Sequence, residues 1–193
     1  MDSVELTDLL AEIRRCHFCE DNLALDPRPV LNVAASARIL IVGQAPGPRV
    51  HETGIPWNDP SGDRLRDWLG VDRDTFYDES RFAIMPMGFC YPGKGKSGDL
   101  PPRRECAPLW HPQLLKNLPK IRLTLLIGSY TQNYYLNDKK VTLTDRVAAW
   151  PEYLPSMFPL VHPSPRNTYW LQKNPWFSSK LVPVLRKEVA KYL

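Results

Sequence analysis

The chain has 193 residues, 43% of them hydrophobic and 24% charged, which is ordinary for a globular protein and enough for a single domain with a sizeable core over residues 1–193. Its formal net charge of +4 permits a nucleic-acid partner but, without a strongly basic tail, confines any phosphate-binding surface to a small local patch. No apolar run approaches the roughly 20 residues that cross a bilayer, and the acidic, amphipathic start is unlike a signal peptide, so we expect a cytoplasmic protein with no membrane partner.

The apolar pattern predicts helices alternating with short buried strands. Helical spacing of apolar residues predicts a helix over about residues 4–15, another beginning near Ser61 with its hydroxyl as the cap, and further helices over 109–118, 129–136 and 177–192. Continuous apolar runs predict strands at 38–42, 82–85, 123–127 and 158–161. This order predicts an α/β fold of three layers, α/β/α, around a central, mainly parallel four-stranded sheet.

Three unusual loops follow predicted strands, at residues 43–58, 88–106 and 162–167. In open parallel sheets, ligands bind outside the carboxyl ends of the strands. We therefore expect these three loops to meet at one edge of the sheet and to form the functional site.

The four cysteines fit one pattern, Cys16-x2-Cys19 followed by Cys90-x15-Cys106. A Cys-x2-Cys turn directs two thiolates at one metal or cluster, and cysteines of a cytosolic chain are more often metal ligands or reduced thiols than disulfides. Spacing alone does not separate a [4Fe–4S] cluster from a tetrahedral zinc site, and four unrelated reduced thiols are the remaining alternative.

A GKS sequence at residues 95–97 is similar to the end of a phosphate-binding P-loop. The motif needs an earlier glycine where this chain has Cys90, and it needs a helix at once, whereas GDLPP follows at residues 98–102. We therefore do not expect nucleotide hydrolysis. The nearby basic residues are solvated loop charges or DNA phosphate contacts: Lys94, Lys96, Arg103 and Arg104.

The loops carry motifs that resemble those of a known family. The turn GQAPG at residues 43–47, the segment ETGIPW at 52–57 and Ser61-Gly62 resemble the first motif of the iron–sulfur uracil-DNA glycosylases, whose four cysteines have similar spacing and hold a [4Fe–4S] cluster. The sequence HPSPRN at 162–167 resembles the second motif of that superfamily and is especially similar to the single-strand-selective monofunctional enzymes. The resemblance extends from Cys16 to about Asn167.

The resemblance implies a DNA base-excision repair glycosylase that hydrolyses the N-glycosidic bond of uracil or another deaminated base. The implied partner is DNA containing such a base, and the implied cofactor is a [4Fe–4S] cluster, with zinc as the alternative, held by Cys16, Cys19, Cys90 and Cys106. Because no lysine lies in a motif typical of Schiff-base lyases, we expect a monofunctional enzyme, and we expect a monomer.

The resemblance also assigns roles to individual residues. Trp57 replaces the stacking Phe of the family, and His162 donates to the uracil O2 atom and stabilises the negative charge that develops as the bond breaks. Gln44 binds the base or positions water, and so counts as catalytic with His162, while Ala45 and Asn58 complete the base-binding set. The residues expected to grip the DNA backbone beside the extruded nucleotide are Pro163, Ser164, Pro165 and Arg166.

Each of these residues also has a plainer interpretation. Trp57 could equally be an aromatic residue of the core, and His162 could be a hydrogen-bonded histidine on a turn. Gln44 is equally suited to holding its loop, and Arg166 to being a surface charge.

Two positions depart from the family pattern. Gln44 stands where the family has Glu, and Pro86 stands where the family has an Asn that reads the uracil edge. Candidate substitutes nearby are His51, Glu52, Asn58 and Asp59. These departures keep a second function open, a non-catalytic or differently acting nucleic-acid-binding protein on the same fold. A zinc-stabilised binding domain without a base pocket is the third.

Overall fold

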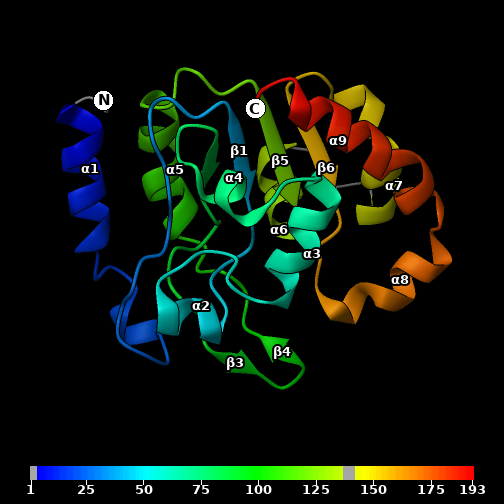
Figure 1. Ribbon diagram of the computed structural model, residues 1–193. Coiled ribbons are helices and arrows are strands. Elements are labelled where there is room, and N and C mark those ends of the chain that lie inside the picture. Colours follow the sequence, from blue (N-terminus) through cyan, green and yellow to red (C-terminus); the bar gives the residue numbers. More distant parts are fainter. Residues whose placement is uncertain (1–3, 137–141) are drawn as a thin grey trace.

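The computed structural model describes residues 4–136 and 142–193, and its centre is a four-stranded parallel sheet (Figure 1). The strands are β1 (Ile39–Val42), β2 (Phe82–Ile84), β5 (Leu123–Ile127) and β6 (Met157–Leu160), in the spatial order β2-β1-β5-β6. All three pairings are parallel, with Ile41 beside both Ile84 and Leu125. The predicted fold class is confirmed, and each strand lies within one residue of its predicted position.

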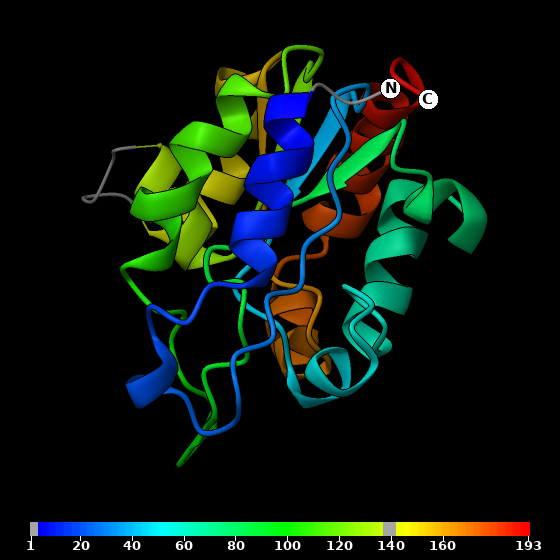
Figure 2. The ribbon, with the colours of Figure 1, turned by 90° about the vertical axis from the view of Figure 1, so that its left-hand side faces the viewer.

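Helices cover both faces of the sheet because alternate residues of each strand point to opposite sides. Ile39 and Ile41 pack in one core cluster with α3 (Pro60–Leu69) and α9 (Val182–Ala190). Leu40 and Val42 pack in the other with α1 (Val4–Arg14) and α5 (Cys106–Lys116). Figures 1 and 2 show the resulting three layers.

The remaining helices are short and lie mostly near the carboxyl ends of the strands or at the sides. They are α2 (Pro48–Thr53), α4 (Arg73–Tyr77), α6 (Ser129–Tyr135), α7 (Leu143–Ala148) and α8 (Thr168–Lys173), the 3-10 turns η1 (Glu20–Asn22), η2 (Trp150–Tyr153) and η3 (Pro165–Asn167), and a π-helical turn η4 (Phe177–Leu181) that leads into α9. Among the helices of the described ranges, none is long and apolar enough to cross a membrane.

The structure corrects three local predictions. Helix α3 begins at Pro60 and its cap is Asp59, whose carboxylate accepts a hydrogen bond from the Gly62 N–H at 2.8 Å, so Ser61 is not the cap. Helix α5 begins at Cys106 rather than at residue 109. The segment 88–108, expected as loop throughout, contains an antiparallel hairpin of β3 (Lys94–Gly95) and β4 (Gly98–Asp99).

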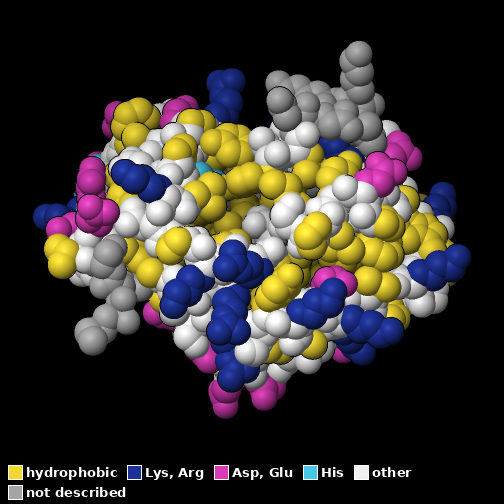
Figure 3. Space-filling model, turned by 90° about the horizontal axis from the view of Figure 1, so that it is seen from above, with side chains coloured by type: hydrophobic (Ala, Val, Ile, Leu, Met, Phe, Trp, Pro, Cys, Tyr) yellow, Lys and Arg dark blue, Asp and Glu magenta, His cyan; other side chains and the backbone are white. Residues whose placement is uncertain are grey.

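The two ends of the sheet differ in character. The hairpin β3–β4 and helix α2 lie at one end, the lower one in Figure 1. Figure 3 shows the opposite end, where apolar side chains cross the middle and acidic and basic side chains surround them. The two signs of charge therefore share that face.

Replacing a side chain in the centre of the sheet should destabilise the protein strongly. Leu125 of β5 is fully buried, so Leu125→Ala is expected to lower the free energy of unfolding by about 2–5 kcal/mol. Leu115 of α5 is 37% exposed, and Leu115→Ala, the matched control, should change it by less than about 0.5 kcal/mol. Urea denaturation measures both, and equal effects would contradict the core assignment.

Candidate functional site

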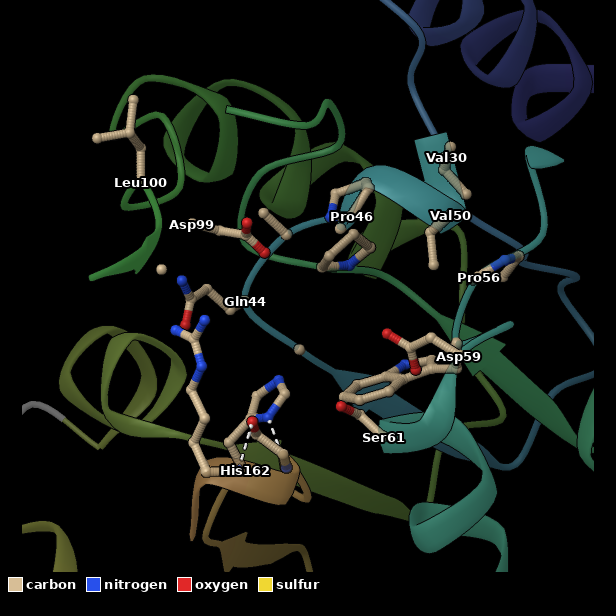
Figure 4. A pocket seen from close by; sticks show the side chains of 18 of the residues that line it. Val30, Gln44, Pro46, Val50, Pro56, Asp59, Ser61, Asp99, Leu100 and His162 are labelled. Carbon is tan, nitrogen blue, oxygen red and sulfur yellow. Dashed lines mark hydrogen bonds between the residues drawn. The ribbon is translucent and has the colours of Figure 1, made fainter. Parts of the chain in front are cut away.

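A cavity of about 470 Å³ lies at the carboxyl ends of the strands, within the range of about 300–1,000 Å³ that is usual for small-molecule sites (Figure 4). Its walls come from the turn after β1 (residues 43–47), the segment 56–61, the hairpin region 97–100 and the loop after β6 (residues 162–167). The three loops that the sequence places after strands therefore meet at one cavity, as predicted.

Trp57 and His162 lie beside each other in the wall of this cavity. Their ring centroids are 5.5 Å apart, with the rings tilted by 33°. Trp57 has a φ of 57°, a left-handed conformation that costs a bulky residue about 1–3 kcal/mol and needs support from its surroundings. Two glycines leave room for it: a Cβ at Gly43 would lie 2.7 Å from the Trp57 ring, and a Cβ at Gly62 would overlap the Trp57 carbonyl.

The hydrogen bonds of His162 define which ring nitrogen carries the proton. The Ser164 N–H donates to Nδ1 of His162 at 3.2 Å, which assigns the proton of the neutral ring to Nε2. Burial lowers the pKa of His162, and the charges of Asp59 and Asp99 act in the opposite sense. Asn167 donates to the His162 carbonyl at 2.8 Å and fixes the turn. The site thus holds a neutral imidazole with an N–H donor.

Two carboxylates line the cavity, Asp59 and Asp99. Asp59 is held in place as the cap of α3. Asp99 comes from the hairpin and accepts a hydrogen bond from the Tyr91 hydroxyl at 3.4 Å. Asp59 is one of the substitutes that the sequence suggests for the two departures from the family pattern, whereas Asp99 is not, because only the fold of the hairpin returns it to the cavity. Gln44 itself lines the cavity without a charge.

The other predicted site residues divide into two groups. Ala45, Ser164 and Arg166 line the cavity, and Arg166 Nη1 donates to the Ser97 carbonyl at 2.7 Å, which joins the loop after β6 to the hairpin. Three predicted residues are not among those that line it. Pro163 is buried, Pro165 is exposed, and the Asn58 amide bonds Thr53 at 3.5 Å and Arg73 at 3.0 Å.

Pro86 forms part of the cavity wall, and its carbonyl is hydrogen-bonded to a buried histidine for which the sequence gives no signal. His111 Nε2 donates to the Pro86 carbonyl at 3.0 Å, and its Nδ1 accepts from the Tyr135 hydroxyl at 2.7 Å. Because that carbonyl is already bonded to His111, the Pro86 side chain presents an apolar wall to the cavity. Burial lowers the pKa of His111 to about 4.

The four cysteines line a separate pocket, in which they share walls with Phe89 and Trp110. The Phe89 N–H donates to Cys106 Sγ at 3.4 Å. Burial raises the pKa of Cys90 to about 11 and that of Cys106 to about 12, and the neighbouring thiolates act in the same direction. Within residues 4–136 and 142–193, no group of three or more His, Cys, Asp or Glu side chains is arranged to hold a single metal ion.

Comparison with known protein families gives one match that covers most of the chain. The model described as the uracil DNA glycosylase superfamily matches residues 32–186. The matched span contains every cavity residue discussed above, together with Cys90 and Cys106.

The buried His111 predicts a loss of stability in acid. Its pKa is about 4 in the folded protein and about 6.5 in an unfolded chain, so between these values only the unfolded state binds the proton. The free energy of unfolding should therefore fall as the pH drops from about 6.5 to 4, by at most about 3 kcal/mol from this group.

The measurement is urea denaturation across that pH range for the wild type and for His111→Gln. The variant should lose the part of this pH dependence that comes from His111, while the part from His162, whose pKa burial also lowers, remains. An unchanged slope would contradict the role given to His111. The same replacement at the exposed His17 controls for the loss of an imidazole as such.

Proposed function

The chain belongs to the uracil-DNA glycosylase superfamily, and from that premise we propose that it is a monofunctional base-excision enzyme for uracil or another deaminated base in DNA. Membership implies a DNA glycosylase, a hydrolase of N-glycosidic bonds whose substrate is DNA. The observation that carries the finer proposal is the pair of Trp57 and neutral His162, which lie side by side in the wall of a cavity at the carboxyl ends of the strands.

The proposed reaction begins when the target nucleotide leaves the duplex stack and its base enters the cavity. The base stacks on Trp57, whose ring and backbone pack closely against two glycines. His162 Nε2–H then donates to a carbonyl oxygen of the base, where negative charge develops as the bond to the sugar breaks. One preorganised donor of this kind contributes about 10²–10³ in rate, and a neutral imidazole suffices for it.

The proposed source of negative charge beside the sugar is the pair Asp59 and Asp99, because Gln44 carries none. A carboxylate stabilises the positive charge that develops on the sugar and orients the water that attacks it. Asp59 is fixed by its hydrogen bond to Gly62, whereas Asp99 lies on the hairpin, so replacing each separately distinguishes them.

We propose that the four cysteines hold a [4Fe–4S] cluster, with zinc as the alternative. Their convergence on one pocket and the N–H donor to Cys106 support a bound group, because burial raises the pKa of Cys90 and of Cys106 and a bound metal would stabilise their thiolates. We favour a cluster over one zinc ion because the cysteines accompany motifs that resemble those of the iron–sulfur members of the superfamily. The cluster would supply a structural cross-link.

The decisive experiment for this function incubates the protein with labelled single- and double-stranded oligonucleotides containing uracil, hypoxanthine or xanthine, followed by alkali. We expect strand cleavage at the abasic site for at least one base. His162→Ala and Trp57→Ala should each reduce it about 100-fold or more, while Tyr169→Ala, an exposed aromatic on α8, should not.

The carboxylates need a variant that removes charge but keeps shape. Asp59→Asn retains a capping side chain for α3, so a loss of rate without a loss of stability would identify the charge as the cause. Asp99→Asn is the parallel test. If the wild type cleaves none of these substrates, the proposal that the protein is a glycosylase is refuted. The second candidate, a non-catalytic base-binding protein, is then favoured by the departures at Gln44 and Pro86.

Metal analysis and absorption spectroscopy test the cluster. Protein purified without oxygen should be brown, with a broad visible band, and contain iron and sulfide. Cys90→Ser and Cys106→Ser should each lower the iron content and the thermal stability. A colourless wild type that contains only zinc would refute the cluster. A protein that binds neither iron nor zinc would support the remaining interpretation, that the four cysteines are unrelated reduced thiols.

A further inference from the structure

A second groove lies beside the base cavity, on the other side of the hairpin region, and nothing in the proposed reaction uses it. It measures about 600 Å³ and lies between Tyr130 and Tyr134 of α6 and the segment 100–102. We call it the tyrosine groove. Leu100 lines both the groove and the base cavity, so the two are neighbours.

The two walls of the tyrosine groove suit a flat ring. Tyr130 and Tyr134 are four residues apart on one helix, which puts both on the same face, and each is 40% exposed. Tyr134 is held from behind by the edges of Tyr135 at 5.1 Å and His111 at 6.0 Å. The opposite wall is apolar, from Leu100 to Pro102. A planar group entering this space meets an aromatic face on one side and apolar side chains on the other.

Basic residues border the groove. Arg103 and Arg104 both line it, and Arg103 is ion-paired with Glu105 at 2.9 Å while Arg104 is exposed. Lys94 and Lys96 of the hairpin are also exposed. An aromatic slot beside exposed cations is the combination that binds single-stranded nucleic acid, since bases stack on the rings and phosphates contact the cations.

We propose that the tyrosine groove binds an unpaired base of the DNA strand that flanks the nucleotide in the base cavity. The proposal rests on DNA as the ligand of the proposed function, and it adds a second nucleotide site. A neighbouring base can stack on Tyr130 or Tyr134 only after it leaves its own duplex stack. The groove therefore favours single-stranded or locally unpaired DNA over intact duplex, whatever the identity of the flanking base.

The test measures binding rather than excision, so that its failure is separate from failure of the glycosylase. Fluorescence anisotropy gives the affinity for an undamaged single-stranded oligonucleotide and for the same sequence as a duplex. Tyr130→Ala and Tyr134→Ala should each weaken single-strand binding at least about fivefold, with a smaller effect on the duplex. Tyr169→Ala, at a 66% exposed tyrosine outside the groove, should change it less than twofold.

Two further measurements separate stacking from folding and locate the strand. Tyr134→Phe keeps the ring and should keep the affinity, even if Tyr134→Ala loosens the packing on His111. An oligonucleotide with 5-iodouracil one or two positions from the target base should crosslink on irradiation to Tyr130 or Tyr134.

The outcomes are distinguishable. Weakened single-strand binding with those crosslinks supports the groove even in a protein that excises no base. Unchanged affinity in the Tyr130→Ala, Tyr134→Ala double variant, or crosslinks only elsewhere, would overturn the groove even if the glycosylase is active.

Discussion

The close approach of the Trp57 backbone to Gly62 is the contact on which the site depends. A side chain at position 62 would collide with the left-handed Trp57, whose ring covers Gly43 and has its centroid 5.5 Å from that of His162. The same segment is tied down on both sides, since the Tyr77 hydroxyl donates to the Pro56 carbonyl at 2.8 Å and the next residues lead into the capped start of α3. A strained aromatic is thus fixed by the end of one helix and the turn after one strand. This arrangement presents a ring to a ligand without further ordering on binding.

The segment between Cys90 and Cys106 connects the cysteine pocket to both cavities. It supplies Asp99 to the base cavity and the apolar wall at residues 100–102 to the tyrosine groove, and it is joined to the loop after β6 by the bond from Arg166 to the Ser97 carbonyl. The segment is largely polar and its only strands are two residues long, so its own packing contributes little stability. A cross-link at its two ends would limit its conformations, which gives a structural cluster a direct effect on the geometry of the site.

The sequence predicts the sheet well because strands buried on both faces are continuous apolar runs, as at residues 39–42 and 123–127. It predicts the meeting of the three loops because parallel strands end at the same edge. It does not predict the hairpin, since KGKSGD at 94–99 has no apolar alternation, and it therefore does not place Asp99 at the cavity.

Two side-chain roles also differ from the prediction. The sequence predicts Ser61 as the cap of α3 because Asp and Ser are both good caps, but the proline at the first helical position favours Asp59. Asn58 has the chemistry of a base reader, but its amide is used locally by Thr53 and Arg73, and residue type does not reveal which way a side chain turns.

In the proposed function, the apolar wall at Pro86 changes how a deaminated base is recognised. Uracil and hypoxanthine share a carbonyl next to a ring N–H, because deamination replaces an exocyclic amine with a carbonyl and leaves a proton on the adjacent nitrogen. In the proposed function His162 Nε2–H donates to uracil O2, which is not the carbonyl made by deamination. The shared pair is left to Gln44, whose amide offers an acceptor for the N–H and a donor for the carbonyl. Recognition of the shared pair does not require the amide that the family has at the position of Pro86. The edge of the base that faces Pro86 gains no hydrogen bond from its side chain. Two bases that differ only at that edge are therefore distinguished by shape alone. The Pro86 wall, held by His111, therefore favours selectivity for a class of bases over selectivity for uracil alone.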